Sequence, residues 1–387
     1  MGSRILPFRH AADKNFWLDI IRGLERLGHE LEVLSVTVED FPNQGLPLRR
    51  VPPIPIYLRP DSRFNPDHWR LAGTNNYASK TITLPRIVRA IRRRTAEFRP
   101  DAIHFIDNYG PAMAGLRAAL GKTPLTVSAP TYQPNNPLYD LFLQASFLSF
   151  DVIVPFSDAY RRRLLDLGFS PNRVRCIRWG VDVDVFLPPT AADQEAARKQ
   201  LHLDGDELVV LWTGFPQQTD EQELFSAVRT AEVALDKAPS RIAFFLCLKP
   251  EHFKETYRRF ERDGVRVLGT ADAFRTARTC ADILLSPIMN TRSTAAPPLV
   301  WVECLAMGIP ILTTDVPGAG EAVVEQESGF RVRSPEEAGE RLLEMRSDPA
   351  LRRRLREGAR RIALERYSTT EILNEYVELW SGLANAA

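Results

Sequence analysis

The chain has 387 residues, of which 44% are hydrophobic and 26% charged, and its formal net charge is +1. These values are ordinary for a globular protein of two domains and exclude a fibrous or wholly disordered chain. Nucleic acid is not an expected partner, because the sequence shows no basic platform interleaved with aromatic residues.

The first hundred residues are basic, with 17 Lys and Arg against 10 Asp and Glu, so the remainder is acidic. A basic end suits an anionic acceptor or an anionic membrane surface, and it is equally typical of a solvated face. The four cysteines are scattered without metal-ligand spacing, which favours a reducing compartment, the cytoplasm. With neither a signal-peptide core nor an apolar segment of about 20 residues, we expect a protein that is soluble or peripheral at the inner membrane face.

In chain order, the first half alternates predicted strands with predicted helices. A helix is expected over residues 16–27, where apolar residues recur at helical spacing, and it ends at Gly28. Strands are expected at 4–8, 31–36, 101–106, 125–128 and 152–155, and further helices at 112–120 and 158–167. This alternation indicates an α/β domain with a parallel sheet.

Two segments of the first half allow alternatives. Residues 61–81 are polar and aromatic, and we interpret them as irregular surface rather than a lid over an acceptor. Residues 86–94 place Ile87, Val88 and Ile91 on one helical face with arginines around them. This pattern fits an interfacial helix on anionic lipid, or an ordinary surface helix with a core stripe, which we favour.

The second half repeats the α/β pattern after Pro188 and Pro189. Strands are expected at 208–213, 242–247, 265–268, 283–286, 311–313 and 329–332, and helices at 222–238, 273–279, 299–307, 335–348, 351–365 and 370–383. We therefore predict an N-terminal Rossmann-like domain at 1–186, a C-terminal one at 187–368, and a terminal helix at 369–387 that packs back on the first. Ligands would bind in a cleft at the carboxyl ends of the strands.

Four stretches carry a family resemblance. Residues 303–332, ECLAMGIPILTTDVPGAGEAVVEQESGFRV, closely resemble the donor-domain signature of retaining family 4 glycosyltransferases. Residues 156–186, ending in a Gly-Val-Asp turn, are similar to the family's interdomain segment. Residues 209–215 (VVLWTGF) and 366–380 (RYSTTEILNEYVELW) are similar to the first strand of its second domain and to its terminal helix.

The resemblance implies the GT-B fold, in which two Rossmann-like, doubly wound domains face each other across a cleft. It also implies transfer of a sugar from a nucleotide-activated donor to an unidentified acceptor with retention of configuration. Two alternatives remain open: a non-catalytic homologue that binds a protein partner, and a transferase that uses a non-nucleotide phosphosugar donor.

The same resemblance implies a donor site. Glu303 would accept hydrogen bonds from the donor ribose, as a carboxylate does well, and Gly318 and Gly320 would form the turn before Glu321. Further donor-binding candidates are Gly214, Lys249, Arg292 and Thr294. The family needs no essential metal or other cofactor, because helix amides and basic side chains offset the diphosphate charge. The two Asp-x-Asp spacings, at 182/184 and 204/206, are interpreted as chance.

The sequence departs from the family where phosphate and sugar would bind. Ala295 stands where the family has its first acid, and Pro298 replaces a glycine, so an amide donor is lost. Phe215 and Asp220 stand where an Arg and a Lys normally balance the diphosphate. The charge could be relocated, and cations in loops that would face the cleft are Arg9, Lys14, Arg178, Lys249 and Arg292.

No catalytic residue is evident, and the candidates are weak. Ser128 aligns with a family histidine that contacts the donor sugar. His104 lies in a predicted strand and either faces the cleft or is a core histidine, and Asp107 and Tyr109 follow that strand at its carboxyl edge. In the first loop, His10 joins Arg9 and Lys14 as candidates for acceptor contact.

Overall fold

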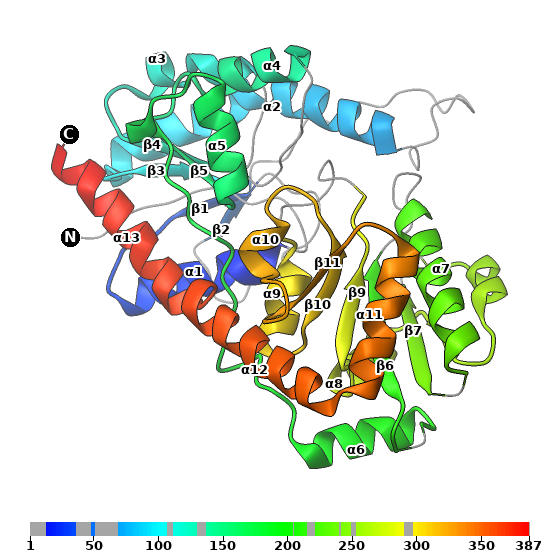
Figure 1. The fold of residues 1–387 in the computed structure, drawn as a ribbon. Helices are drawn as coiled ribbons and strands as arrows, with labels where there is room; N and C mark the ends of the chain where they lie inside the picture. Colours follow the sequence, from blue (N-terminus) through cyan, green and yellow to red (C-terminus); the bar gives the residue numbers. More distant parts are fainter. Residues whose placement is uncertain are drawn as a thin grey trace. The chain divides into compact units, whose positions relative to one another are not determined.

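The computed structural model describes residues 13–35, 48–50, 69–106, 111–129, 137–203, 205–214, 221–239, 241–248, 253–289 and 297–386. The chain divides into two compact units, drawn in Figure 1: unit 1 comprises residues 1–180 and 369–387, and unit 2 comprises residues 181–368. The predicted division lay at 186, close after the observed one at 180.

Unit 1 contains two groups of parallel strands. Strands pair in the order β3-β4-β5, and β1 pairs with β2. Its elements are α1 (Asp13–Arg26), β1 (Val33–Ser35), β2 (Leu48–Arg50), α2 (Trp69–Phe98), β3 (Ile103–Phe105), η1 (Pro111–Gly115), α3 (Leu116–Leu120), β4 (Leu125–Ala129), α4 (Pro137–Phe147), β5 (Val152–Pro155), α5 (Asp158–Asp166), η2 (Pro171–Arg173) and α13 (Thr369–Ala386). The helix predicted at 112–120 is therefore a 3₁₀ turn followed by a short α-helix. The strand predicted at 4–8 lies outside the described residues.

Helix α2 corrects one prediction. It begins at Trp69, so much of the segment expected to be irregular is helical. Gly73 and the asparagines at 75 and 76 have low helix propensity, so the sequence did not predict this extension. Extending a helix that is already nucleated through such residues costs little free energy. Farther along, Ile87 and Ile91 are buried, as an ordinary surface helix with a core stripe requires.

Helices α1 and α13 are neighbours in unit 1 although they come from opposite ends of the chain (Figure 1). The buried face of α1 includes Phe16 and Trp17, and α13 contributes Tyr376 and Trp380. Gly23 allows the two helices to approach closely, because a Cβ there would lie 2.5 Å from Leu373 Cδ2. The terminal helix is therefore part of the core of unit 1.

Unit 2 is a six-stranded parallel sheet in the order β11-β10-β9-β6-β7-β8. Its elements are α6 (Ala191–Gln200), β6 (Leu208–Gly214), α7 (Glu221–Lys237), β7 (Ile242–Leu248), η4 (Glu255–Phe260), β8 (Val265–Leu268), α8 (Ala271–Thr279), β9 (Ile283–Ser286), α9 (Leu299–Ala306), β10 (Ile311–Thr314), α10 (Ala319–Ala322), β11 (Gly329–Val332), α11 (Pro335–Ser347) and α12 (Pro349–Arg366). Two apolar cores pack on the two faces of the sheet, one including residues of α8, α9 and α12, the other residues of α7 and α11.

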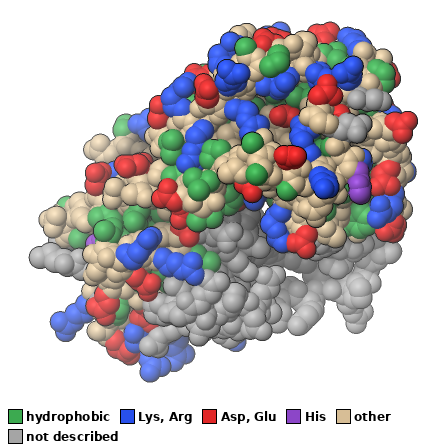
Figure 2. Space-filling model, turned by 90° about the horizontal axis from the view of Figure 1, so that it is seen from below, with side chains coloured by type: hydrophobic (Ala, Val, Ile, Leu, Met, Phe, Trp, Pro, Cys, Tyr) green, Lys and Arg blue, Asp and Glu red, His purple; other side chains and the backbone are tan. Residues whose placement is uncertain are grey.

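The strands of unit 2 are short apolar runs because both of their faces are covered. Val209 and Leu211 of β6 face one core, and Val210 and Trp212 face the other. Among the described residues, none of the helices combines the length and the apolarity needed to cross a membrane. The surface visible in Figure 2 carries Lys and Arg intermixed with Asp and Glu, as the small net charge suggests.

Candidate functional site

The order of the strands in the unit 2 sheet identifies the edge at which a ligand is expected to bind. From β6 the chain moves outward to β7 and β8, and then returns to place β9 on the other side of β6. Such a reversal opens a crevice outside the carboxyl ends of the two central strands, where open α/β sheets bind ligands. The strands that meet there are β6, ending at Gly214, and β9, ending at Ser286.

Glycine is required at the end of β6. A Cβ at Gly214 would lie 2.7 Å from the ring of Trp212, so a side chain there would collide with the core. Gly214 was predicted to bind the donor, and the structure gives it a packing role at the expected edge.

The start of α9 is fixed to this edge. The helix begins at Leu299 directly after Pro298, as the proline pair predicts. Trp301 is fully buried, and its Nε1 donates a hydrogen bond to Ser286 Oγ at 2.8 Å. Thr313 Oγ1 donates to Ser286 O at 2.7 Å. These bonds tie the first turn of α9 to the ends of β9 and β10.

Glu303 follows one turn later on α9 and is held by an arginine. Its Oε2 accepts a hydrogen bond from Arg278 Nη1 of α8 at 3.0 Å. The side chains of Arg278 and Glu303 are 16% and 19% exposed, so the pair is partly buried but reachable from solvent. Glu303 is thus a paired and partly exposed carboxylate on α9.

Two aromatic rings hold the guanidinium of Arg278. Its Cζ lies 5.4 Å from the ring centroid of Phe186 and 5.2 Å from that of Phe274, distances at which a cation is attracted to an aromatic face. Its Nε is buried and has no hydrogen-bond partner in the described part of the chain. Stacking and the ion pair together therefore fix the position of this side chain.

Another arginine, Arg360, caps the C-terminus of α9. Arg360 Nη1 donates to Ala306 O and Phe186 O at 2.6 and 3.0 Å, and its Nη2 donates to Val183 O at 3.0 Å. A cation at a helix C-terminus satisfies its carbonyls and opposes the helix dipole. Arg360 also holds the segment that carries Phe186, one of the rings on Arg278.

The predicted glycine turn lies after β10. Gly318 has φ +86°, in the left-handed region that glycine adopts without strain, and α10 starts directly after it. A Cβ at Gly320 would lie 3.3 Å from Arg331 Nη1, which pairs with Asp315 at 2.8 Å. The carbonyl of Glu321 accepts a bond from Arg366 Nη1 at 2.9 Å.

In unit 1, His104 is a core histidine. It is fully buried, and its Nδ1 and Nε2 lie 2.8 Å from Thr126 Oγ1 and Ser128 Oγ. The rings of Trp17, Tyr376 and Trp380 surround it, with centroids 5.2, 5.6 and 5.4 Å away. Burial lowers the pKa of His104 from 6.5 to about 3, so the ring is neutral at physiological pH.

This placement removes His104 and Ser128 as exposed catalytic candidates in the conformation observed, because both ring nitrogens have partners and both residues are buried. Arg178, proposed as a relocated charge, instead pairs with Asp158 in unit 1. Seven predicted site residues lie outside the described residues: Arg9, His10, Asp107, Tyr109, Lys249, Arg292 and Thr294. Lys14 lies in α1, but its side chain is also outside the description.

The thiols of Cys280 and Cys304 are not set up as nucleophiles. Burial raises the pKa of Cys280 to about 11 and that of Cys304 to about 12, so both stay protonated. Within the described ranges, no three His, Cys, Asp or Glu side chains cluster as metal ligands would. Asp182 Oδ1 accepts a bond from the amide of Asp184, so the first Asp-x-Asp spacing forms a turn.

A pocket of about 570 Å³ lies at the opposite end of α9, lined in part by Pro188, Met307 and Leu364. Its arginines are already engaged: Arg356 pairs with Asp282, and Arg360 binds the carbonyls described above. The pocket lies where α9 ends, away from the carboxyl edge of the sheet, and we do not assign it to the candidate site.

Sequence reasoning missed Arg278. In the sequence it is one of two similar arginines on α8, and nothing distinguishes it from Arg275, which pairs with Asp272 at the surface. Its pairing with Glu303 follows from the fold, which brings these side chains of α8 and α9 together.

Comparison with known proteins matches two glycosyltransferase profiles to successive parts of the chain. Residues 14–185 match the profile of Glycosyltransferase Family 4, and residues 199–348 match that of Glycosyl transferases group 1. A D-inositol 3-phosphate glycosyltransferase of Acidothermus cellulolyticus is 32% identical over 214 residues, which are 51% of this chain and 46% of that protein. The chain spans about half the length of the curated relatives it matches.

Solved structures share the fold across the whole chain. A glycosyltransferase from Rickettsia africae has a TM-score of 0.74 at 15% identity and covers 100% of both chains. Anabaena HepE in complex with UDP and glucose has a TM-score of 0.70 at 16% identity, covering 98% of this chain and 99% of that one. At such low identity these likenesses concern the fold.

Proposed function

This chain belongs to the family 4 glycosyltransferases and has their GT-B fold, and on that premise we propose that it transfers a sugar from a nucleotide-activated donor to an acceptor with retention of configuration. The observation that supports the proposal is Glu303, which matches the family's ribose glutamate in sequence and lies on α9, a helix whose first turn is tied to the end of β9. Attack would occur on the face from which the phosphate leaves, with that phosphate assisting, so no separate general base is needed.

The donor is proposed to be a nucleoside diphosphate sugar. Glu303 would accept hydrogen bonds from the ribose hydroxyls, and charge-assisted bonds of this kind are the stronger ones. A crystal structure of Anabaena HepE is a complex with UDP-glucose, which supports a nucleotide-sugar donor for a chain of the same fold. The reaction is proposed to need no metal.

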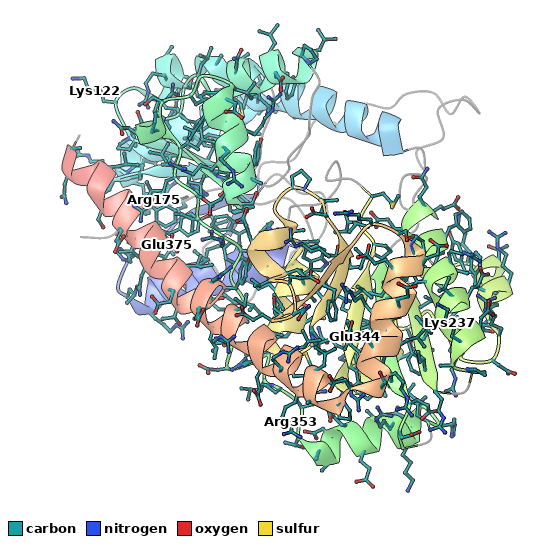
Figure 3. All side chains as sticks on the ribbon, viewed as in Figure 1. Lys122, Arg175, Lys237, Glu344, Arg353 and Glu375 are labelled. Carbon is teal, nitrogen blue, oxygen red and sulfur yellow. The ribbon has the colours of Figure 1, made fainter. Side chains whose placement is uncertain are left out.

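The acceptor is proposed to be anionic or to lie in an anionic membrane. Arg86, Arg89 and Arg92 are exposed on α2, and Lys122 points outward beyond α3 (Figure 3). On α4 of the same unit, Leu138 and Leu141 are 80% and 64% exposed. Exposed basic side chains and exposed leucines in one unit suit an anionic bilayer surface. Flotation with phosphatidylglycerol vesicles, but not with phosphatidylcholine vesicles, would support an acceptor in an anionic membrane; no binding to either would contradict that alternative and leave a soluble anionic acceptor.

The donor proposal is tested by a ligand-stabilisation scan. UDP, GDP, ADP, TDP, CDP, their common sugar conjugates and plain sugar phosphates are compared by the shift in melting temperature. A ligand at about a hundred times its dissociation constant stabilises the fold by about 2.7 kcal/mol, an easily visible shift. We expect one nucleotide to be preferred, and Glu303→Gln to weaken it about tenfold, or about 1.4 kcal/mol.

The matched control is Glu344→Gln on α11, labelled in Figure 3, which also removes a carboxylate paired with an arginine in unit 2. It should leave nucleotide affinity unchanged. Equal affinity in the Glu303 and Glu344 variants would remove the ribose role. A shift in melting temperature with sugar phosphates alone would favour the phosphosugar donor. No shift with any of the ligands would favour a non-catalytic partner subunit. Turnover of the preferred donor then establishes the enzyme.

A further inference from the structure

We infer that Arg278 is a positioning residue for the ribose-binding carboxylate of Glu303, and this inference rests on the proposed function. Nothing in the family signature that this chain resembles includes Arg278. Its role is argued from the contacts of unit 2 alone.

The first step concerns geometry. A glutamate on a helix surface samples several rotamers, and ordering it costs free energy when a ligand binds. Arg278 Nη1 donates to Glu303 Oε2 at 3.0 Å and so selects one arrangement before any ligand arrives. The arginine can do this because its own position is fixed by Phe186 and Phe274. Preorganisation of this kind improves affinity by lowering the ordering cost.

The second step concerns charge. A bare carboxylate close to a diphosphate would repel it, and this repulsion is strongest where water is partly excluded. Arg278 offsets that charge while the carboxylate still accepts hydrogen bonds, since a carboxylate offers about four lone-pair sites. The ion pair would therefore reduce the repulsion between the ribose-binding carboxylate of Glu303 and a diphosphate bound in the same site. This compensation is especially useful here because the family's usual Arg and Lys are replaced by Phe215 and Asp220.

The third step compares the two arginines of α8. Arg275 pairs with Asp272 on the same helix, and both side chains are mostly exposed, at 64% and 84%. Arg278 reaches a different helix and is only 16% exposed. An exposed pair within one helix contributes little and positions nothing. Arg275 is therefore the natural control for Arg278.

The experiment measures how strongly the protein prefers ribonucleotides. UDP and GDP are titrated against the full chain, each beside its 2′-deoxy counterpart, in wild type, Arg278→Gln, Arg275→Gln, Glu303→Gln and the double variant at 278 and 303. If Arg278 positions Glu303, Arg278→Gln lowers the ribo-to-deoxy affinity ratio about tenfold, and the double variant is no worse than Glu303→Gln. Arg275→Gln leaves the ratio unchanged.

Two results would overturn the inference while sparing the proposed function. In the first, the ribo-to-deoxy ratio falls for Glu303→Gln but not for Arg278→Gln. In the second, Arg278→Gln weakens binding of the ribonucleotide and of its 2′-deoxy counterpart by the same factor. A ratio that no variant changes would remove the ribose role and the inference with it. If Arg278→Gln does not fold, Arg278→Lys keeps the cation but loses the planar fork. It must then lower the ratio by a smaller factor, and an unchanged ratio would overturn the inference.

Discussion

Each unit contains a titratable side chain that the sequence predicted as a site residue: His104 in unit 1 and Glu303 in unit 2. The two side chains differ in burial and in their partners. In unit 1, His104 is sealed in the core between two hydroxyls and three aromatic rings. In unit 2, Glu303 meets a charged partner and keeps 19% of its side chain exposed. Both residues have partners within the protein, but of the two only Glu303 is accessible to solvent. Accessibility, more than residue type, therefore decides which of the two we propose as a ligand-binding residue.

The largest effect that this comparison predicts is on stability, and it comes from replacing His104. Replacing it with Asn should lower the free energy of unfolding by about 3 kcal/mol, because the hydroxyls of Thr126 and Ser128 lose a buried partner and a cavity opens among the rings. The control is His202→Asn, since His202 is exposed with φ +51°, a conformation that Asn tolerates, and should change stability by less than about 0.5 kcal/mol. Urea denaturation measures both. Equal effects would place His104 outside the core.

The same histidine predicts a pH dependence. Its pKa is about 3 in the fold against 6.5 ordinarily, so between these values the unfolded chain binds a proton that the native state does not. The free energy of unfolding should therefore fall as pH is lowered below 6.5, by up to about 1.4 kcal/mol per pH unit. Denaturation at pH 7, 6 and 5 should show a steeper fall in wild type than in His104→Asn. Parallel curves would contradict the lowered pKa.

How much of this was foreseeable can be argued from particular elements. Each of the six strands of unit 2 lies within one residue of its predicted bounds, because a buried parallel strand is a short continuous apolar run that local sequence reveals. The extension of α2 back to Trp69 was not foreseen, because local propensity opposes it at Gly73. The network around His104 joins β3 and β4 to α13, whose residues come more than 200 positions later in the sequence. Such partners follow from topology, and local patterns carry no trace of them.

The ion pair in unit 2 predicts a much smaller effect on stability than the histidine does. Glu303→Gln should change the free energy of unfolding by less than about 1 kcal/mol, because the side-chain oxygen of Gln can still accept a hydrogen bond from Arg278, which also keeps its two rings. Urea denaturation of Glu303→Gln beside Glu344→Gln measures this. A loss as large as that of His104→Asn would make Glu303 a core group, and the contrast between the two units would disappear.

The smallest expected effect comes from removing divalent metals. The diphosphate charge must be offset by something, and the proposal assigns that task to helix amides and basic side chains rather than to an ion. Dialysis against EDTA should then leave nucleotide affinity and sugar transfer unchanged. Added magnesium should not raise them. If EDTA abolishes transfer and magnesium restores it, the charge lost with the replacement by Phe215 and Asp220 is supplied by a metal. Glu303 would then act beside that metal, and the compensation assigned to Arg278 would be secondary.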